Sequence, residues 1–232
     1  NARLSVRDSL VDWRELILGD QSSLILDKYH PYEDLPKMIN PTSGYIFNTN
    51  NSPFNSTAEF ENLKEEDYNS TFSFMEEENN RSIRFMELID EYEKLSYEDF
   101  KEIKYDQQYP DSILYIGNIS QIFDLDKSEF PNYENLIDLI QNWDRRGDIE
   151  NIGAAQWSLY YSYMLDVLSK NDLSVKDTID IKFHIDALEK TKDRLMKNFG
   201  KLDIRLGDIQ RLVRGDKSFP VSGLIDMIAP TY

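Results

Sequence analysis

A group of asparagines, Asn48, Asn50 and Asn51, is the part of the sequence with the clearest chemical potential. In residues 45–49, β-branched and aromatic side chains follow an Asn-Pro-Thr-Ser-Gly turn, and this pattern predicts a strand. Because side chains alternate along a strand, we expect Asn48 and Asn50 on one side and Thr49 on the other. An amide held in this way is a fixed N–H donor for a developing oxyanion. The alternative is a loop of Asx turns, which the spacing alone favours.

Two arginines form a second candidate group. Arg81 and Arg84 lie three residues apart where a helix is expected to begin, so they share one helix face. Cations are unfavourable near the positive N-terminal end of a helix dipole, which suggests that another group retains these arginines. The simpler interpretation is a surface ion pair with Glu77 or Glu78.

Metal, cofactor and thiol chemistry find no support in the sequence. The chain has no cysteine, which excludes disulfides, thiolate zinc sites and cysteine nucleophiles. His30 and His184 are far apart in the sequence, and neither belongs to a triad or zinc motif. A calcium-like start at Asp124 has Glu129 where the loop needs glycine and Asn135 where it needs glutamate. We therefore expect no metal and no cofactor.

Composition sets the broad class. The chain has 232 residues, a formal net charge of −17, 40% hydrophobic residues and 12% aromatic residues. This is enough for a core of one large or two small domains, and too aromatic for a disordered acidic chain. The acidity argues against nucleic acid and anionic membrane surfaces. No apolar run approaches the ~20 residues of a membrane span.

Four segments are expected along the chain. Residues 1–54 carry the predicted strand and turns, 55–80 form an acidic loop, 81–199 are helical, and 200–232 return to turns and short extended pieces. In the helical segment apolar residues recur every three or four positions. Helices are expected near residues 80–92, 97–106, 110–119, 131–143, 154–168 and 174–199.

Several helix ends carry recognisable signals. Ser96 with Asp99 resembles a capping box, in which each side chain binds the other residue's backbone N–H. Ser174 is a candidate N-cap for the last long helix. Gly200 stands where that helix is expected to end in a left-handed conformation.

A family resemblance rests on residues 35–53, which read LPKMINPTSGYIFNTNNSP. They resemble a β-chain segment of the penicillin acylase family, whose pattern is approximately LPxxxNPxSGyixNxNNxP. The resemblance is closest to the branch that holds acyl-homoserine lactone acylases and aculeacin acylase. That branch typically precedes the motif with a Trp and a Gly-Asp, as in Trp13 and Gly19-Asp20.

Three later segments resemble the same family. Residues 81–99 are similar to its arginine-bearing helix and the helix that follows. Residues 142–144 with Gly153-Ala154 are similar to its WD…gA segment, and residues 206–221 to its late gdvhRlxRG…lPv segment. The resemblance thus covers most of the chain.

The resemblance implies an N-terminal-nucleophile hydrolase with an αββα sandwich, made as a precursor that cleaves itself. An N-terminal Ser attacks, its own α-amino group serves as the base, and the substrate is a small N-acylated amide. By position in the motif, Asn50 supplies a side-chain amide to the oxyanion hole. Arg81 corresponds to the arginine that orients the active site.

One departure shapes the expectation for this chain. Residue 1 is Asn rather than Ser, Thr or Cys, so the nucleophile is expected outside these residues. We expect an α+β, predominantly helical fragment of the sandwich, inactive alone, whose partners are the α-chain and the rest of the β-chain. The family suggests a periplasmic or secreted protein. The face buried against the sandwich is expected to carry Met86, Leu139, Leu159, Tyr163 and Leu188.

A rival hypothesis is an acidic, helical, extracellular binding module without catalysis. The 14 tyrosines and 3 tryptophans would suit stacking on sugars. The position of the aromatic residues separates the two hypotheses. At helical spacing, Trp157, Tyr160 and Tyr163 are expected in the core, whereas exposure on one concave face would favour binding.

Overall fold

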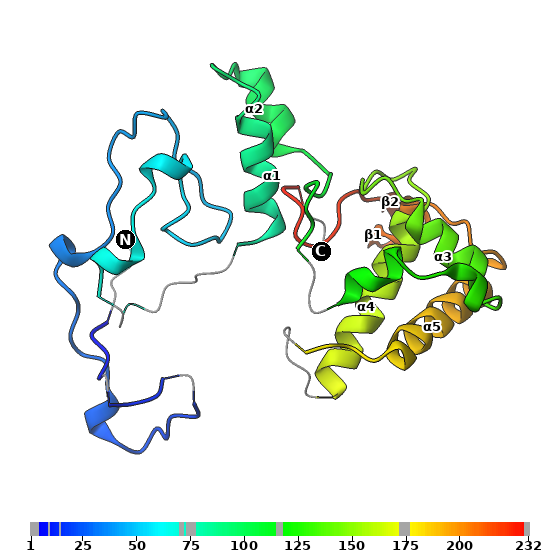
Figure 1. Ribbon diagram of the computed structural model, residues 1–232, viewed down its shortest axis with the longest axis horizontal. Coiled ribbons are helices and arrows are strands. Elements are labelled where there is room, and N and C mark those ends of the chain that lie inside the picture. The colour runs from blue at the N-terminus through cyan, green and yellow to red at the C-terminus, as the bar shows by residue number, and fades with distance from the viewer. Residues whose placement is uncertain are drawn as a thin grey trace. The chain divides into compact units, whose positions relative to one another are not determined.

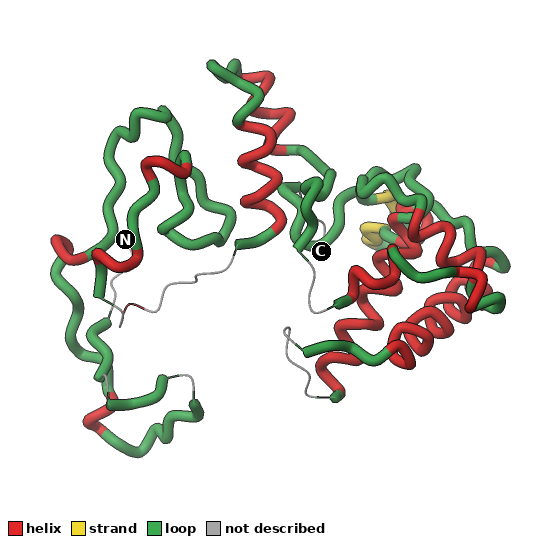
Figure 2. Tube along the Cα trace, in the orientation of Figure 1, coloured by secondary structure: helices red, strands yellow, loops and turns green. Residues whose placement is uncertain are grey.

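The computed structural model describes residues 5–8, 10–13, 15–69, 72, 78–114, 118–171 and 177–229. The chain divides into two compact units, Asn1–Asn79 and Asn80–Tyr232, and each is described by itself. In Figure 2 the described part of the first unit is mostly loop with short helical turns, whereas the second contains the long helices.

The first unit is held mainly by side chains that bind backbone groups. Among its described residues, the 3₁₀ turns are η1 (Ser22–Leu24), η2 (Tyr32–Asp34), η3 (Glu59–Glu61) and η4 (Glu65–Asp67). Thr57 is fully buried, and its hydroxyl donates to the Tyr45 carbonyl at 2.9 Å. The Asn62 side-chain oxygen accepts from the N–H groups of Ser56 and Thr57 at 2.9 and 3.1 Å.

The predicted strand at residues 45–49 is wrong: these residues, all described, are not assigned to a strand. The Phe47 N–H donates to the Ser56 carbonyl at 2.9 Å, but no ladder continues from this bond. A strand exists through a series of such pairs with a neighbour. Thr57 and Asn62 instead bind the backbone here through their side chains.

The second unit is helical (Figure 1). Its helices and strands are α1 (Asn80–Ile89), α2 (Tyr97–Lys104), η6 (Ile119–Phe123), η7 (Lys127–Glu129), α3 (Glu134–Gln141), α4 (Ala154–Lys170), α5 (Ile181–Phe199), α6 (Leu206–Ile209), β1 (Arg211–Arg214) and β2 (Lys217–Pro220). The two strands form an antiparallel hairpin with Leu212 opposite Phe219. None of the helices that the structure describes has the length and apolar character needed to cross a membrane.

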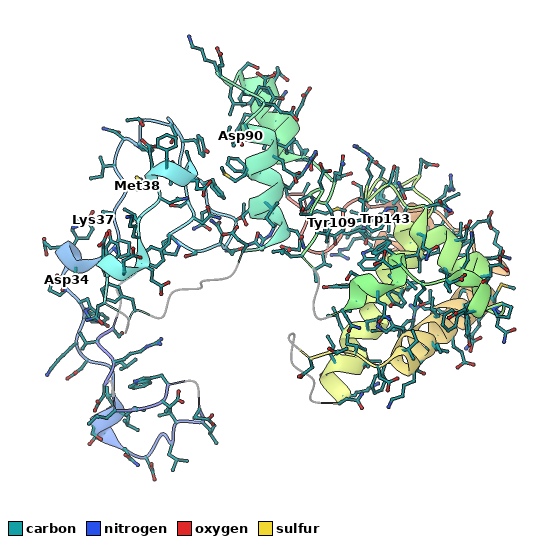
Figure 3. All side chains as sticks on the ribbon, viewed as in Figure 1. Asp34, Lys37, Met38, Asp90, Tyr109 and Trp143 are labelled. Carbon is teal, nitrogen blue, oxygen red and sulfur yellow. The ribbon has the colours of Figure 1, made fainter. Side chains whose placement is uncertain are left out.

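The core of this unit forms between α3, α4 and α5. Trp143 and Trp157 stack with ring centroids 5.7 Å apart, and Tyr109 meets Trp143 edge-on at 5.9 Å. Figure 3 labels Tyr109 and Trp143, which lie side by side. Leu188 is fully buried there, as predicted. Leu159 and Tyr163 are partly buried against the same cluster.

Two further residues expected on the buried face, Met86 and Leu139, are only half-buried. Both helices that carry them are short, and their fully buried apolar positions fall elsewhere, at Ile89 in α1 and at Leu136, Ile137 and Ile140 in α3. Both predicted helices are therefore present, but the residues on their buried faces differ from those predicted.

Two of the sequence signals for helix ends are confirmed, and each lies within a few residues of the end that it specifies. The Ser96 side chain accepts from the Asp99 N–H and Asp99 accepts from the Ser96 N–H, which confirms the capping box. Gly200 ends α5 with φ +70°, as expected. Ser174 lies outside the described residues. The described residues show α5 beginning at Ile181, where Asp180 is the N-cap and accepts from the Lys182 N–H at 2.9 Å.

The prediction of a helix that begins at Pro110 is wrong for the described residues 110–114, because they are not helical. Side chains of α1 bind their backbone: the Asp111 N–H donates to Glu87 at 2.9 Å and the Leu114 N–H to Asn80 at 2.7 Å. These amides are engaged by another element, so a helical turn does not form there. The helix predicted near residues 131–143 begins at Glu134 as α3, and residues 131–133 form turns before it.

Candidate functional site

Asn50 stands at an exposed, left-handed position of the first unit. Its backbone φ is +66°, a conformation that Asn adopts more readily than most residues other than glycine. Its backbone N–H donates to the Asn48 side-chain oxygen at 2.8 Å, which is an Asx turn. The alternative interpretation of this segment is therefore confirmed. The alternation of side chains expected for a strand does not apply.

The neighbouring asparagines hold this loop in shape. The Asn51 side-chain oxygen accepts from the Thr49 N–H and hydroxyl at 2.8 and 2.9 Å, and its amide donates to the Asn55 carbonyl. The Asn79 amide donates to the Thr49 carbonyl at 3.0 Å. These side chains are thus used for loop structure, while the Asn50 side chain lies on the exposed surface of the loop.

A carboxylate anchors the start of the same loop. Glu61 accepts from the Thr42 N–H at 2.6 Å, from the Thr42 hydroxyl and from the Ser43 N–H at 3.0 Å. The hydrogen bonds from Thr42 and Ser43 lower the pKa of Glu61 to about 2. Glu61 is therefore ionised near neutral pH and remains an acceptor for the turn that leads to Asn50.

Arg81 lies in the first turn of α1 in the second unit. Its Nε donates to Asp226 at 3.0 Å, and the two side chains are 24% and 28% exposed. The other oxygen of Asp226 accepts from the Asn80 backbone N–H at 2.8 Å and from its side-chain amide at 3.0 Å. Asp226 therefore compensates the unfavourable position of a cation at a helix N-terminus.

Arg84 is enclosed more deeply than Arg81. Its Nε and one terminal nitrogen bind the two oxygens of Asp106, each at 3.1 Å, and the other terminal nitrogen binds Glu87 at 3.1 Å. The Arg84 and Asp106 side chains are only 15% and 14% exposed. Burial opposes the charge of Arg84, but its hydrogen bonds to Asp106 and Glu87 outweigh the effect of burial and raise its pKa.

Among the described residues, Arg81 pairs with Asp226, and Arg84 pairs with Asp106 and Glu87. Glu77 lies outside the described residues, and Glu78 accepts from the Asn55 side chain. Asp106 and Asp226 were both missed by sequence reasoning. Asp226 is 145 positions from Arg81, and no local periodicity or motif connects residues so far apart.

Each of the two histidines contacts an aromatic side chain. His184 is fully buried in α5, and its Nδ1 is 2.6 Å from the Tyr160 hydroxyl of α4. Burial lowers the pKa of His184 and raises that of Tyr160, which favours the neutral form of each side chain. His30 meets the Phe72 ring edge-on at 4.6 Å. Among the residues that the structure describes, no three His, Asp or Glu side chains gather in a way that could hold a metal.

A comparison with protein families identifies the chain. The family model for penicillin amidase matches residues 3–223, which is nearly the whole sequence. The match includes the asparagine loop, both arginines of α1 and the β1–β2 hairpin. The family comprises acylases that hydrolyse amides. The chain therefore belongs to the penicillin amidase family.

Proposed function

We propose that this chain supplies the oxyanion-hole amide, Asn50, of an acylase that cleaves N-acyl amide bonds of small molecules. The observation that carries the proposal is the loop at residues 48–51. The Asn48 side chain accepts from the Asn50 N–H and the Asn51 side chain accepts from the Thr49 N–H, so hydrogen bonds hold the loop that carries Asn50. A donor fixed in advance stabilises a charge that appears only in the transition state.

In this proposal the attacking group is an N-terminal Ser whose α-amino group acts as the base. As the Ser oxygen adds to the amide carbon, the carbonyl oxygen becomes an oxyanion and accepts from the Asn50 Nδ2–H. Collapse of the tetrahedral intermediate releases the amine and leaves an acyl-enzyme that water hydrolyses. Arg81 orients the active-site amides through its fixed guanidinium.

The wider context is part of the same proposal. In this proposal the partners of the chain are the α-chain and the rest of the β-chain, which supplies the Ser nucleophile. The parent adopts the αββα sandwich and works in the periplasm or outside the cell. Trp13, Gly19-Asp20 and the asparagine motif support the branch of acyl-homoserine lactone and aculeacin acylases.

The rival binding-module hypothesis loses its main support. Trp143, Trp157 and Tyr160 are 4%, 3% and 0% exposed and belong to the core between the helices. Buried rings cannot stack on a sugar. The exposed tyrosines include Tyr29 and Tyr32 in the first unit and, in the second, Tyr97 and Tyr105 at the two ends of α2.

The left-handed backbone at Asn50 decides which variant tests the proposal. Asn50→Ala removes the amide but also strains the loop, whereas Asn50→Gly removes the amide and accepts φ +66° without strain. In the processed acylase that contains this chain, Asn50→Gly should lower kcat by roughly 100- to 1000-fold with little change in KM. Steady-state kinetics on an N-acylated substrate measure both.

Asn40→Gly is the matched control. Asn40 is also exposed, has φ +51° and lies in the same unit, but we assign it no catalytic role. It should leave kcat within about twofold of the native value. Near-native kcat for Asn50→Gly, or equal losses for both variants, would contradict the role of Asn50.

A further inference from the structure

Asp226 occupies a position that links the helix carrying Arg81 to the far end of the chain. One carboxylate oxygen accepts two hydrogen bonds from Asn80, the first residue of α1, and the other accepts from Arg81 Nε at 3.0 Å. In Figure 1 the red C-terminal segment lies beside the start of α1. One side chain thus fixes both the helix start and the guanidinium.

The backbone around Asp226 is itself anchored. Leu224 and Met227, on either side, are 3% and 1% exposed and belong to the core. The Tyr109 hydroxyl donates to the Ile225 carbonyl, and the Gly223 N–H donates to the Gly147 carbonyl at 2.7 Å. Asp226 has φ +61°, an uncommon conformation that Asp tolerates better than most residues. A carboxylate whose neighbours Leu224 and Met227 are anchored in the core is a rigid partner for Arg81.

We propose that Asp226 is a positioning residue of the acylase, which fixes the direction of the Arg81 guanidinium. This inference rests on the proposed role of Arg81. A guanidinium bound at Nε cannot rotate freely about its last side-chain bonds, so its terminal nitrogens keep one direction. Asp226 acts through Arg81 and makes no contact with the reacting atoms.

The neighbouring arginine provides an internal comparison. Arg84 has its own carboxylate, Asp106, which is also contributed by a segment outside α1. The two pairs share a helix and the same pairing chemistry, but only Arg81 has a proposed part in the reaction. The Arg84–Asp106 pair, with a structural role, can therefore be compared with the Arg81–Asp226 pair, with a proposed positioning role, on the same helix.

The test is a double-mutant cycle in the processed acylase with Arg81→Ala, Asp226→Asn and the double variant. Asn at 226 tolerates the left-handed backbone and still offers an oxygen to the Asn80 N–H, so the cap is kept while the charge beside Arg81 is lost. We expect Asp226→Asn to lower kcat by roughly 10- to 100-fold with KM nearly unchanged. The double variant should be no slower than Arg81→Ala, because Asp226 acts through Arg81.

Asp106→Asn is the control and should lower the unfolding temperature with kcat nearly unchanged. The proposal is overturned if the two losses in kcat multiply in the double variant. It is also overturned if Asp226→Asn lowers stability and leaves kcat intact. If Arg81→Ala itself keeps native kcat, both the role of Arg81 and this inference are wrong. If only Arg81→Ala slows the enzyme, this inference alone is wrong.

If the Asp226→Asn protein is not processed to the mature acylase, a second variant tests the same role. Asp226→Glu keeps the charge and shifts it by one methylene group, which moves the guanidinium without removing its partner. We expect a smaller loss in kcat than for Asp226→Asn or Arg81→Ala, again with KM nearly unchanged. A native kcat with a displaced carboxylate would overturn the positioning role.

Discussion

At the scale of single residues, Asn50 is distinguished by its backbone as much as by its side chain. The flanking Asx turn and the contacts of Asn51 place it in the left-handed region, where most side chains cost about 1–2 kcal/mol. The chemistry proposed for Asn50 and the geometry of the loop therefore favour the same residue type. Asn50→Asp would tolerate the backbone but repel the oxyanion.

His184 carries a prediction about pH. Its pKa is lowered by burial in the folded protein, from an ordinary value of 6.5, so the folded state holds it neutral. Its contribution to stability is fully present above about pH 6.5 and is lost as the pH falls towards its folded-state pKa. Urea unfolding between pH 5 and 8 should show a falling free energy of unfolding below about pH 6.5.

The control for this prediction is His184→Gln, which cannot titrate. It should lower stability at neutral pH and remove most of the pH dependence in this range. An identical pH dependence in both proteins would show that His184 does not control it.

At the scale of elements, α1 holds two arginines with different surroundings. We expect Arg84→Ala to cost about 2–3 kcal/mol of stability, because it leaves the mostly buried Asp106 carboxylate without its charged partner. A surface ion pair, the simpler interpretation of the sequence, would contribute less than about 1 kcal/mol. Arg81→Ala should cost less stability, since Asp226 keeps its bonds to Asn80. Chemical denaturation of the two variants measures the difference, and equal costs would contradict the assignment.

The helices also show where sequence patterns suffice. The capping box at Ser96 and the end of α5 at Gly200 were predictable, because each signal lies within a few residues of the end it specifies. Residues 110–114 were not, since their amides bind Asn80 and Glu87 of another element. The strand expected at residues 45–49 failed for a related reason: side chains of Thr57 and Asn62 bind the backbone in place of a neighbouring strand.

At the scale of the whole molecule, the chain consists of two units, and each holds one of the two residues to which a catalytic role is proposed. Asn50 belongs to the first unit and Arg81 to the second, and the boundary falls at the peptide bond between Asn79 and Asn80. Within the first unit Asn79 binds the asparagine loop, and within the second unit Asn80 binds Asp226. The motif residues were readable from the sequence. Asp226 was not, because only folding brings it to α1.

The central claim is that Asn50 binds the oxyanion, and affinity for a tetrahedral analogue tests it most directly. A boronic acid that carries the acyl group of a substrate forms a tetrahedral adduct with the Ser nucleophile of the processed acylase. Its inhibition constant should rise by roughly 100- to 1000-fold in Asn50→Gly, in proportion to the fall in kcat/KM, and stay unchanged in Asn40→Gly. Native affinity of Asn50→Gly for the boronate would contradict the account.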